Sequence, residues 1–130
     1  MSTLRGAVGK LWAAPNTLLG LLLGLPSLAF GARIVPGHNA LQFLGYPLGS
    51  GALTLGNVVL YAGCRPDELG AGYGVARVPL GLHEQAHTLQ YERLGPLFLP
   101  VYVLAGGINS RNPLERAADD YAGGGSWWPW

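Results

Sequence analysis

Residues 82–95 read LHEQAHTLQYERLG and form a polar, ionisable segment in a chain that is otherwise rich in glycine, proline and apolar residues. Apolar residues recur in this segment at three-to-four spacing, which predicts a helix, and Gly95 followed by Pro96 predicts its end. His83 and His87 are four residues apart, so a helix places both imidazoles on one face, about one turn from each other. This spacing suits two ligands of a single metal ion.

A second helix is expected to complete the site. Asn112 is a predicted N-cap, and Pro113 stands at the first helical position. Glu115 on this helix is the candidate third metal ligand, and Asp119, four residues later on the same face, is a candidate acceptor for a histidine ring N–H. Glu84 points away from direct ligation, in the place where a general base acting on water must lie.

The same residues also have purely structural interpretations. His83 and His87 could be helix-face histidines satisfied by hydrogen bonds, and Glu84 could be a solvated helix carboxylate. Glu115 stands at the position of a capping-box residue, which the helix dipole favours. We prefer the metal site because each of two helices offers a pair of candidate groups at four-residue spacing. His38 is expected to be a solvated turn residue rather than a ligand.

Composition limits the classes of function. Charged residues make up 12% of the 130 residues and the formal net charge is +1, so the chain lacks the basic surface that nucleic-acid binding requires. The single cysteine, Cys64, cannot form an internal disulfide. Positive mean hydropathy with little charge indicates that part of the surface meets lipid or a partner protein.

The first apolar segment has three interpretations. Residues 16–31 carry no charge, with Lys10 before them and Arg33 after, but this run is shorter than the roughly 20 residues that span a bilayer unless Trp12 and its neighbours extend it. It can be a membrane helix or a tight hairpin bent at Pro26, a cleaved signal peptide, or a soluble core helix. We favour the membrane interpretation, in which Trp12 is an interfacial anchor.

The remaining segments predict a small sheet and apolar connections. Residues 32–45 read as a hairpin around a Pro-Gly-His-Asn turn, and residues 54–61 as a third strand. Residues 95–107 are apolar but too short to span a bilayer, so they are expected to be buried or to dip into a membrane. The tail, Trp127 to Trp130, is interpreted as an interfacial anchor or as a lid on the core.

These features predict an α+β protein. Its parts are an N-terminal apolar helix or hairpin at the membrane, a small antiparallel sheet, and two zinc-ligand helices joined by an apolar segment. We expect one domain over residues 1–130, divided into an apolar membrane-associated segment (1–35), the sheet (36–64), the zinc-site helices (79–122) and a tryptophan-rich tail (123–130).

Two blocks of the sequence resemble a known signature. HEQAH followed by NPLERAAD is similar to the His-Glu-x-x-His and Glu-x-x-x-Asp motifs of gluzincin metallopeptidases. Together with TLLGLLLGL, ALTLGNVVL and the terminal GSWWPW, these blocks resemble a family of small uncharacterised bacterial membrane-associated proteins. The resemblance implies that His83, His87 and Glu115 bind zinc and that Glu84 is the catalytic base. It also implies that Asp119 accepts a hydrogen bond from a zinc-bound histidine, and that the protein lies in the bacterial inner membrane.

The expected function is therefore that of a membrane-associated zinc metallopeptidase or metallohydrolase, acting on a peptide or protein substrate and in contact with lipid or a membrane protein. The alternative is a non-catalytic accessory or structural subunit that keeps the motif for folding or packing. Gluzincins also need an oxyanion-stabilising residue, and spacing singles out none of the candidates Tyr91, Tyr102, Tyr121, Arg93 and Arg116.

Overall fold

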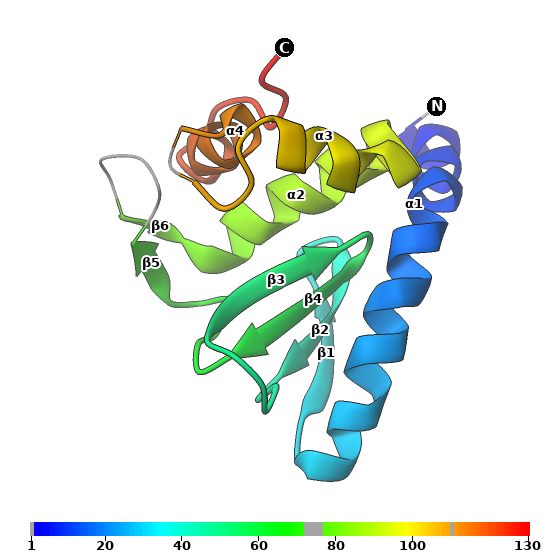
Figure 1. Cartoon of the computed structure of the whole chain (residues 1–130), viewed down its shortest axis with the longest axis vertical. Helices are drawn as coiled ribbons and strands as arrows, with labels where there is room; N and C mark the ends of the chain where they lie inside the picture. Colours follow the sequence, from blue (N-terminus) through cyan, green and yellow to red (C-terminus); the bar gives the residue numbers. More distant parts are fainter. Residues whose placement is uncertain (1, 72–76, 110) are drawn as a thin grey trace.

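The computed structural model describes residues 2–71, 77–109 and 111–130. It confirms the α+β class: α1 runs along one side of a small sheet, and α2, α3 and α4 lie across one end (Figure 1). In chain order the elements are α1 (Ser2–Gly24), the 3-10 helix η1 (Leu25–Phe30), β1 (Arg33–Gly37), β2 (Ala40–Leu44), β3 (Gly51–Leu55), β4 (Val58–Ala62), β5 (Leu69–Ala71), β6 (Arg77–Pro79), α2 (Leu80–Leu94), the 3-10 helix η2 (Gly95–Leu97), α3 (Phe98–Leu104) and α4 (Pro113–Ala122).

The N-terminal apolar segment is a helix and not a hairpin. Residues Gly6–Phe30 are long and apolar enough to cross a membrane, although a signal sequence or the core helix of a soluble protein has the same length and composition. Pro26 lies at the start of η1, where the missing N–H of proline costs no helical hydrogen bond.

Small and polar residues form the buried face of α1. A side chain at Gly20 would bring its Cβ within 2.7 Å of the Val58 Cβ, and one at Gly24 within 2.8 Å of the Phe43 ring. Glycine is therefore required at both positions for the helix to approach the sheet this closely. The buried residues of this face recur every three or four positions along the helix and η1: Gly9, Ala13, Asn16, Gly20, Gly24 and Ser27.

The sheet is mixed, so the prediction of an antiparallel sheet is wrong in one pairing. Its strand order is β1-β2-β4-β3, and β2 pairs with β4 in parallel, whereas the two hairpins β1-β2 and β3-β4 are antiparallel. Every residue of β4 is buried, while β1 is exposed throughout. A strand that is buried on both faces is apolar along its whole length. The continuously apolar sequence of β4 therefore suits its central position between β2 and β3.

The predicted strand over residues 54–61 is also corrected. The chain turns at Gly56, whose φ of 61° is in the left-handed region, and residues on either side belong to β3 and β4. The expected hairpin over residues 32–45 is confirmed as β1 and β2. His38 and Asn39, with φ values of 50° and 60°, form its two-residue turn, which matches the twist of the strands.

Both helices predicted over residues 79–122 are present. α2 ends where Gly95 adopts a φ of 58°, and the Asn112 side chain accepts a hydrogen bond from the Leu114 N–H at the start of α4. The apolar segment between them forms η2 and α3, in which Phe98 is buried and Leu104 is exposed. α2 contacts α1, α4 and β3, so it lies at the centre of the molecule.

The close packing of α1 makes a prediction about two of its glycines. Gly20→Ala should lower the free energy of unfolding by about 1–3 kcal/mol because the added methyl group meets Val58. Gly6→Ala is the matched control: nothing lies within 4 Å of the added methyl group, and alanine should raise stability by up to about 1 kcal/mol. Denaturant unfolding measures both, and equal stabilisation by the two substitutions would contradict the packing of α1.

Candidate metal centre

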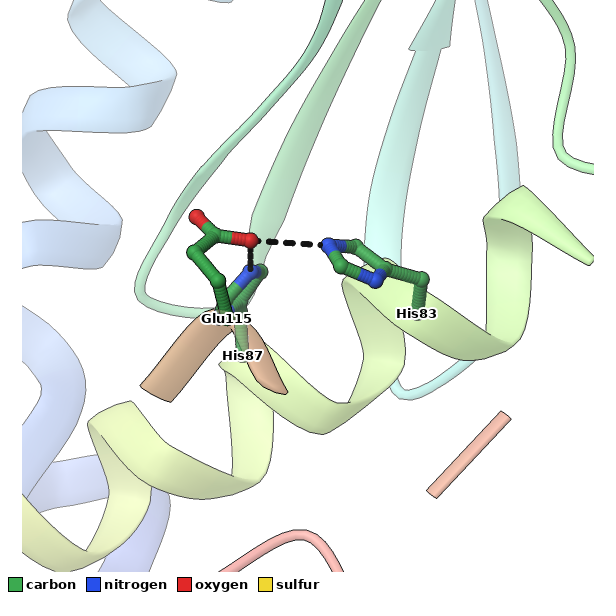
Figure 2. A group of neighbouring side chains, drawn as sticks. All are labelled: His83, His87 and Glu115. Carbon is green, nitrogen blue, oxygen red and sulfur yellow. Dashed lines mark hydrogen bonds and ion pairs between the residues drawn. The ribbon is translucent and has the colours of Figure 1, made fainter. Parts of the chain in front are cut away.

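Two histidines of α2 and one glutamate of α4 converge on a single point. The same carboxylate oxygen, Glu115 Oε1, lies 3.0 Å from His83 Nε2 and 3.2 Å from His87 Nε2 (Figure 2). One donor atom from each of the three residues lies within 4.8 Å of the others, and all three side chains are buried. The predicted grouping of these residues is thus confirmed, and together they could hold a metal ion.

The spacing of the donor atoms can be compared with that of a zinc site. Zinc binds imidazole nitrogen and carboxylate oxygen at about 2.0–2.1 Å, so the edge of a regular tetrahedron of ligands is about 3.3 Å. The two observed nitrogen–oxygen distances, 3.0 and 3.2 Å, are within a few tenths of an ångström of this value. These two distances are compatible with a metal ion bound at such lengths, and all three donor atoms lie within 4.8 Å of one another.

The outer nitrogens of both rings are held by acceptors. His83 Nδ1 lies 2.8 Å from Asp119 Oδ1, and His87 Nδ1 lies 2.9 Å from Gln90 Oε1. An acceptor on Nδ1 keeps the hydrogen there, which leaves Nε2 of each ring to face the centre, as in known metal sites. Asp119 lies where the sequence predicted a supporting acceptor.

Gln90 is a site residue that the sequence analysis did not identify. It is fully buried, and besides meeting His87 its amide nitrogen donates to the backbone oxygens of Leu114 and Trp127. It therefore joins α2, α4 and the C-terminal tail at the metal centre. Its position three residues after His87, on the same helical face, was the available signal.

The capping-box alternative for Glu115 is wrong. The backbone N–H of Asn112, which a capping box would bind, donates instead to the Asn109 carbonyl. The Glu115 carboxylate faces Nε2 of both histidines, and it accepts a hydrogen bond from the Tyr102 hydroxyl. Burial alone would raise the pKa of this carboxyl, but these hydrogen bonds hold it well below its ordinary value.

His87 titrates differently from a free histidine. Burial disfavours its charged form, but the hydrogen bond and the negative charge of Glu115 outweigh burial and raise its pKa to about 9. Both of its ring nitrogens face oxygen acceptors, which is the arrangement of a protonated imidazole. In the metal-free protein at neutral pH, a proton therefore occupies the nitrogen that a metal would bind.

Glu84 lies beside the centre without joining it. Its Oε1 accepts a hydrogen bond of 2.7 Å from the Thr54 hydroxyl on β3, and its Oε2 is 3.9 Å from His83 Nε2. Burial raises the pKa of this carboxyl above its ordinary value. The side chain is thus oriented by the sheet and faces the same space as the histidines.

A cavity of about 150 Å³ opens onto the three converging residues. Volume of this order accommodates a few water molecules or a small part of a substrate. Its lining combines ionisable residues with apolar and aromatic ones, so a charge inside is only partly exposed to water. The lining residues are Ala52, Leu53, Thr54, His83, Glu84, His87, Tyr91, Phe98, Leu99, Tyr102, Ile108 and Glu115.

Among the candidate oxyanion-stabilising residues, two tyrosines line this cavity. Tyr102 bonds Glu115, and the Tyr91 hydroxyl donates to the Thr54 carbonyl oxygen at 2.9 Å. Arg93 instead lies over the Trp128 ring, 4.3 Å from its centroid. Arg116 and Tyr121 do not line the cavity.

Two further predicted features lie outside the centre. His38 is half-buried in the β1-β2 turn, 3.1 Å from the Gln42 side chain, and is not part of the group that could hold a metal. In the tail, Trp127 and Trp128 are half-buried and contact α2 through Gln90 and Arg93, whereas Trp130 is exposed. The first part of the tail therefore packs on the protein.

No protein-family model, curated protein or solved structure matches this chain.

The support that Asp119 gives to His83 leads to a prediction. Asp119→Ala should weaken metal affinity by about 10- to 100-fold, because the ring of His83 loses the acceptor that orients it. Asp120→Ala is the matched control, since this neighbouring carboxylate is exposed and is expected to leave affinity unchanged. Titration with zinc against a competing chelator measures both constants; equal affinities would show that Asp119 does not support the site.

The titration of His87 predicts how metal binding depends on pH. Its raised pKa of about 9 means that a metal ion must displace a proton at any lower pH. Apparent affinity should therefore rise with pH, by about tenfold per unit for one displaced proton, and level off above pH 9. Calorimetry in buffers of different ionisation enthalpy counts the protons released. Binding at pH 7 without proton release would contradict the protonated state of His87.

Proposed function

We propose that this protein is a membrane-associated, zinc-dependent hydrolase that acts as a gluzincin-type metallopeptidase. One observation carries the proposal: His83, His87 and Glu115 converge at a buried point beside Glu84 and a cavity. The motif resemblance supports the same assignment, because it implies these residues in these roles.

Zinc is the metal that suits the donor set best. Two imidazole nitrogens and one carboxylate oxygen are the usual protein ligands of catalytic zinc, which keeps its fourth position open. Calcium and magnesium prefer sites built from oxygen ligands, and thiolate-binding metals would need cysteines. Burial gives a further reason to expect a cation. The carboxyl groups of Glu84, Glu115 and Asp119 are all buried in this part of the core, and buried negative charge needs a positive partner.

The chemistry follows from the positions of the side chains. A bound zinc ion would supply a Lewis acid that makes water and a carbonyl group more reactive. Glu84 is held by Thr54 at the edge of the cavity, where its free oxygen can take a proton from water and pass it to a leaving amine. Tyr102 holds Glu115 in place and presents its ring to the cavity.

Membrane association rests on the N-terminal helix. Residues 6–30 are long and apolar enough for a bilayer, and many of their leucines are exposed. An apolar surface of this extent on a soluble monomer is uncommon. Placement at the bacterial inner membrane is the setting that the family resemblance implies.

A second candidate function is that of an accessory subunit in which the metal only stabilises the fold. The observation that favours it is the small cavity, together with the position of Arg93, which lies on Trp128 and away from the cavity. Both functions require the metal centre, and they differ in whether Glu84 acts on a substrate.

Metal analysis and two variants test these alternatives. The purified protein should contain about one zinc per chain, and His83→Ala should lose it. Glu84→Gln should keep the zinc while reducing hydrolysis of a quenched fluorescent peptide library by at least about 100-fold, because the general base is removed. The exposed Glu68→Gln serves as the control and should retain activity.

The outcomes separate the two functions from each other and from the absence of a metal site. A protein that binds zinc but cleaves no peptide, with Glu84→Gln indistinguishable from the parent, would favour the accessory subunit. A protein that binds no zinc, with His83→Ala unchanged in stability, would remove both.

A further inference from the structure

The outer side of α1 carries a row of exposed apolar side chains. Leu11, Leu18 and Leu22 are 75%, 61% and 72% exposed, and their spacing of seven and four residues places them on one stripe of the helix. This stripe, here called the leucine face, is opposite the small residues that pack on the protein. α1 runs along the flank of the sheet for most of its length (Figure 1).

The inner side of α1 is bonded to the rest of the protein near the helix start. Lys10 pairs with Glu92 at 3.3 Å, and the Trp12 indole N–H donates to the Arg93 carbonyl oxygen at 3.2 Å. The buried Asn16 side chain donates to the Gly95 carbonyl oxygen at 3.1 Å. These bonds attach α1 to the end of α2.

Contacts continue to the other end of the helix. The Thr17 hydroxyl accepts a hydrogen bond from the Asn57 N–H at 2.9 Å. Further along the helix, Gly20 lies close to Val58, and Gly24 lies close to the Phe43 ring. α1 is thus packed against α2 and then against the sheet over a length of about 20 Å. It is part of the folded body and not a separate anchor.

This packing determines how α1 can meet a bilayer. If α1 crossed the hydrocarbon core, β1, which is a sheet edge, and charged groups such as Glu92 would enter it at the same depth. Unpaired strand edges and ionised side chains are not tolerated there. A helix that lies along the surface instead immerses only its leucine face, to the depth of the headgroup and acyl boundary.

The charge composition of the N-terminal half of the chain favours an anionic surface. The first 66 residues contain no aspartate or glutamate, and their basic residues are Arg5, Lys10, Arg33 and Arg65. Lys10 and the exposed Arg33 bracket the apolar run of α1 and η1 in the sequence. Lys10 also pairs with Glu92, and Arg65 pairs with Asp67 and Glu68. An apolar run with basic residues before and after it in the sequence, and with a half-exposed tryptophan, Trp12, is typical of helices that lie in the membrane interface.

We propose that α1 binds anionic lipid surfaces through the leucine face while lying parallel to the membrane, without crossing it. The inference rests on the membrane association of the proposed function and specifies its geometry and lipid, but it needs neither metal nor catalysis. It places the body of the protein, with α2 and the sheet, on one side of the bilayer.

Vesicle binding tests the surface and its charge preference. The full-length protein should float with vesicles of phosphatidylcholine and phosphatidylglycerol, and bind pure phosphatidylcholine vesicles less tightly. The double variant Leu18→Gln/Leu22→Gln should reduce partitioning by about tenfold or more. Leu69→Gln is the control: this exposed leucine is on β5, at the other side of the molecule from α1 (Figure 1), and its loss should leave partitioning unchanged.

Depth measurement separates a helix on the surface from one that spans. In a Cys64→Ala background, spin labels placed singly at positions 11, 18 and 22 should report equal, shallow depths. In a spanning helix the label at 18 would lie about 10 Å deeper than the label at 11, since seven residues rise at 1.5 Å each. That result would overturn the proposal.

Two further results would decide against it. Leucine-face variants that bind vesicles like the parent protein would show that another surface meets the lipid. A stable dimer that the Leu18→Gln/Leu22→Gln variant disrupts, with no vesicle binding by the parent, would assign the face to a second copy. His83→Ala should bind vesicles normally, so failure of the metal site and failure of lipid binding are distinguished.

Discussion

The carboxylate of Glu115 is the interaction on which the candidate site depends. One of its oxygens lies within hydrogen-bond distance of Nε2 of both His83 and His87, and the other accepts from Tyr102, so a single side chain ties α4 to α2 and α3. The pair of imidazoles points inward only because Asp119 and Gln90 hold their outer nitrogens. A charged carboxylate buried among histidines is stable when a proton or a cation lies between them. A metal ion that displaced the proton would neutralise the same carboxylate.

α2 is packed on several sides. The helix lies against α1, α4 and β3, so its histidines cannot shift without disturbing three neighbours. Its polar residues bond to several neighbouring elements. Glu84 accepts from Thr54 of the sheet, Gln90 donates to the backbone of the tail, and Glu92 forms an ion pair with Lys10 of α1. The small-residue face of α1 supports the same helix from the other side. The centre and the leucine face are thus two sides of one packed body.

Local patterns in the sequence predicted the elements that depend on near neighbours. The helix of the histidines, its end at Gly95, the cap at Asn112 and the turn at His38 and Asn39 each follow from a few adjacent residues. The common face of His83 and His87 was also predictable from their four-residue spacing. Glu115 was expected from the need for a third ligand and from the motif resemblance, but its approach depends on the packing of α4 against α2. Strand order was not, because the parallel pairing of β2 with β4 depends on which strand the core covers.

The sequence by itself determined which groups were available: two imidazoles and the carboxyl groups at helical spacing, and an apolar N-terminal run free of acidic residues. Only the tertiary structure decided their partners. It gave His87 the acceptor Gln90 and Glu84 the donor Thr54. It also turned Gly9, Gly20 and Gly24 of α1 inward and Leu11, Leu18 and Leu22 outward. The physical reason is that helix and turn formation depends on neighbours within a few residues, whereas burial and hydrogen-bond pairing are set by contacts between distant segments.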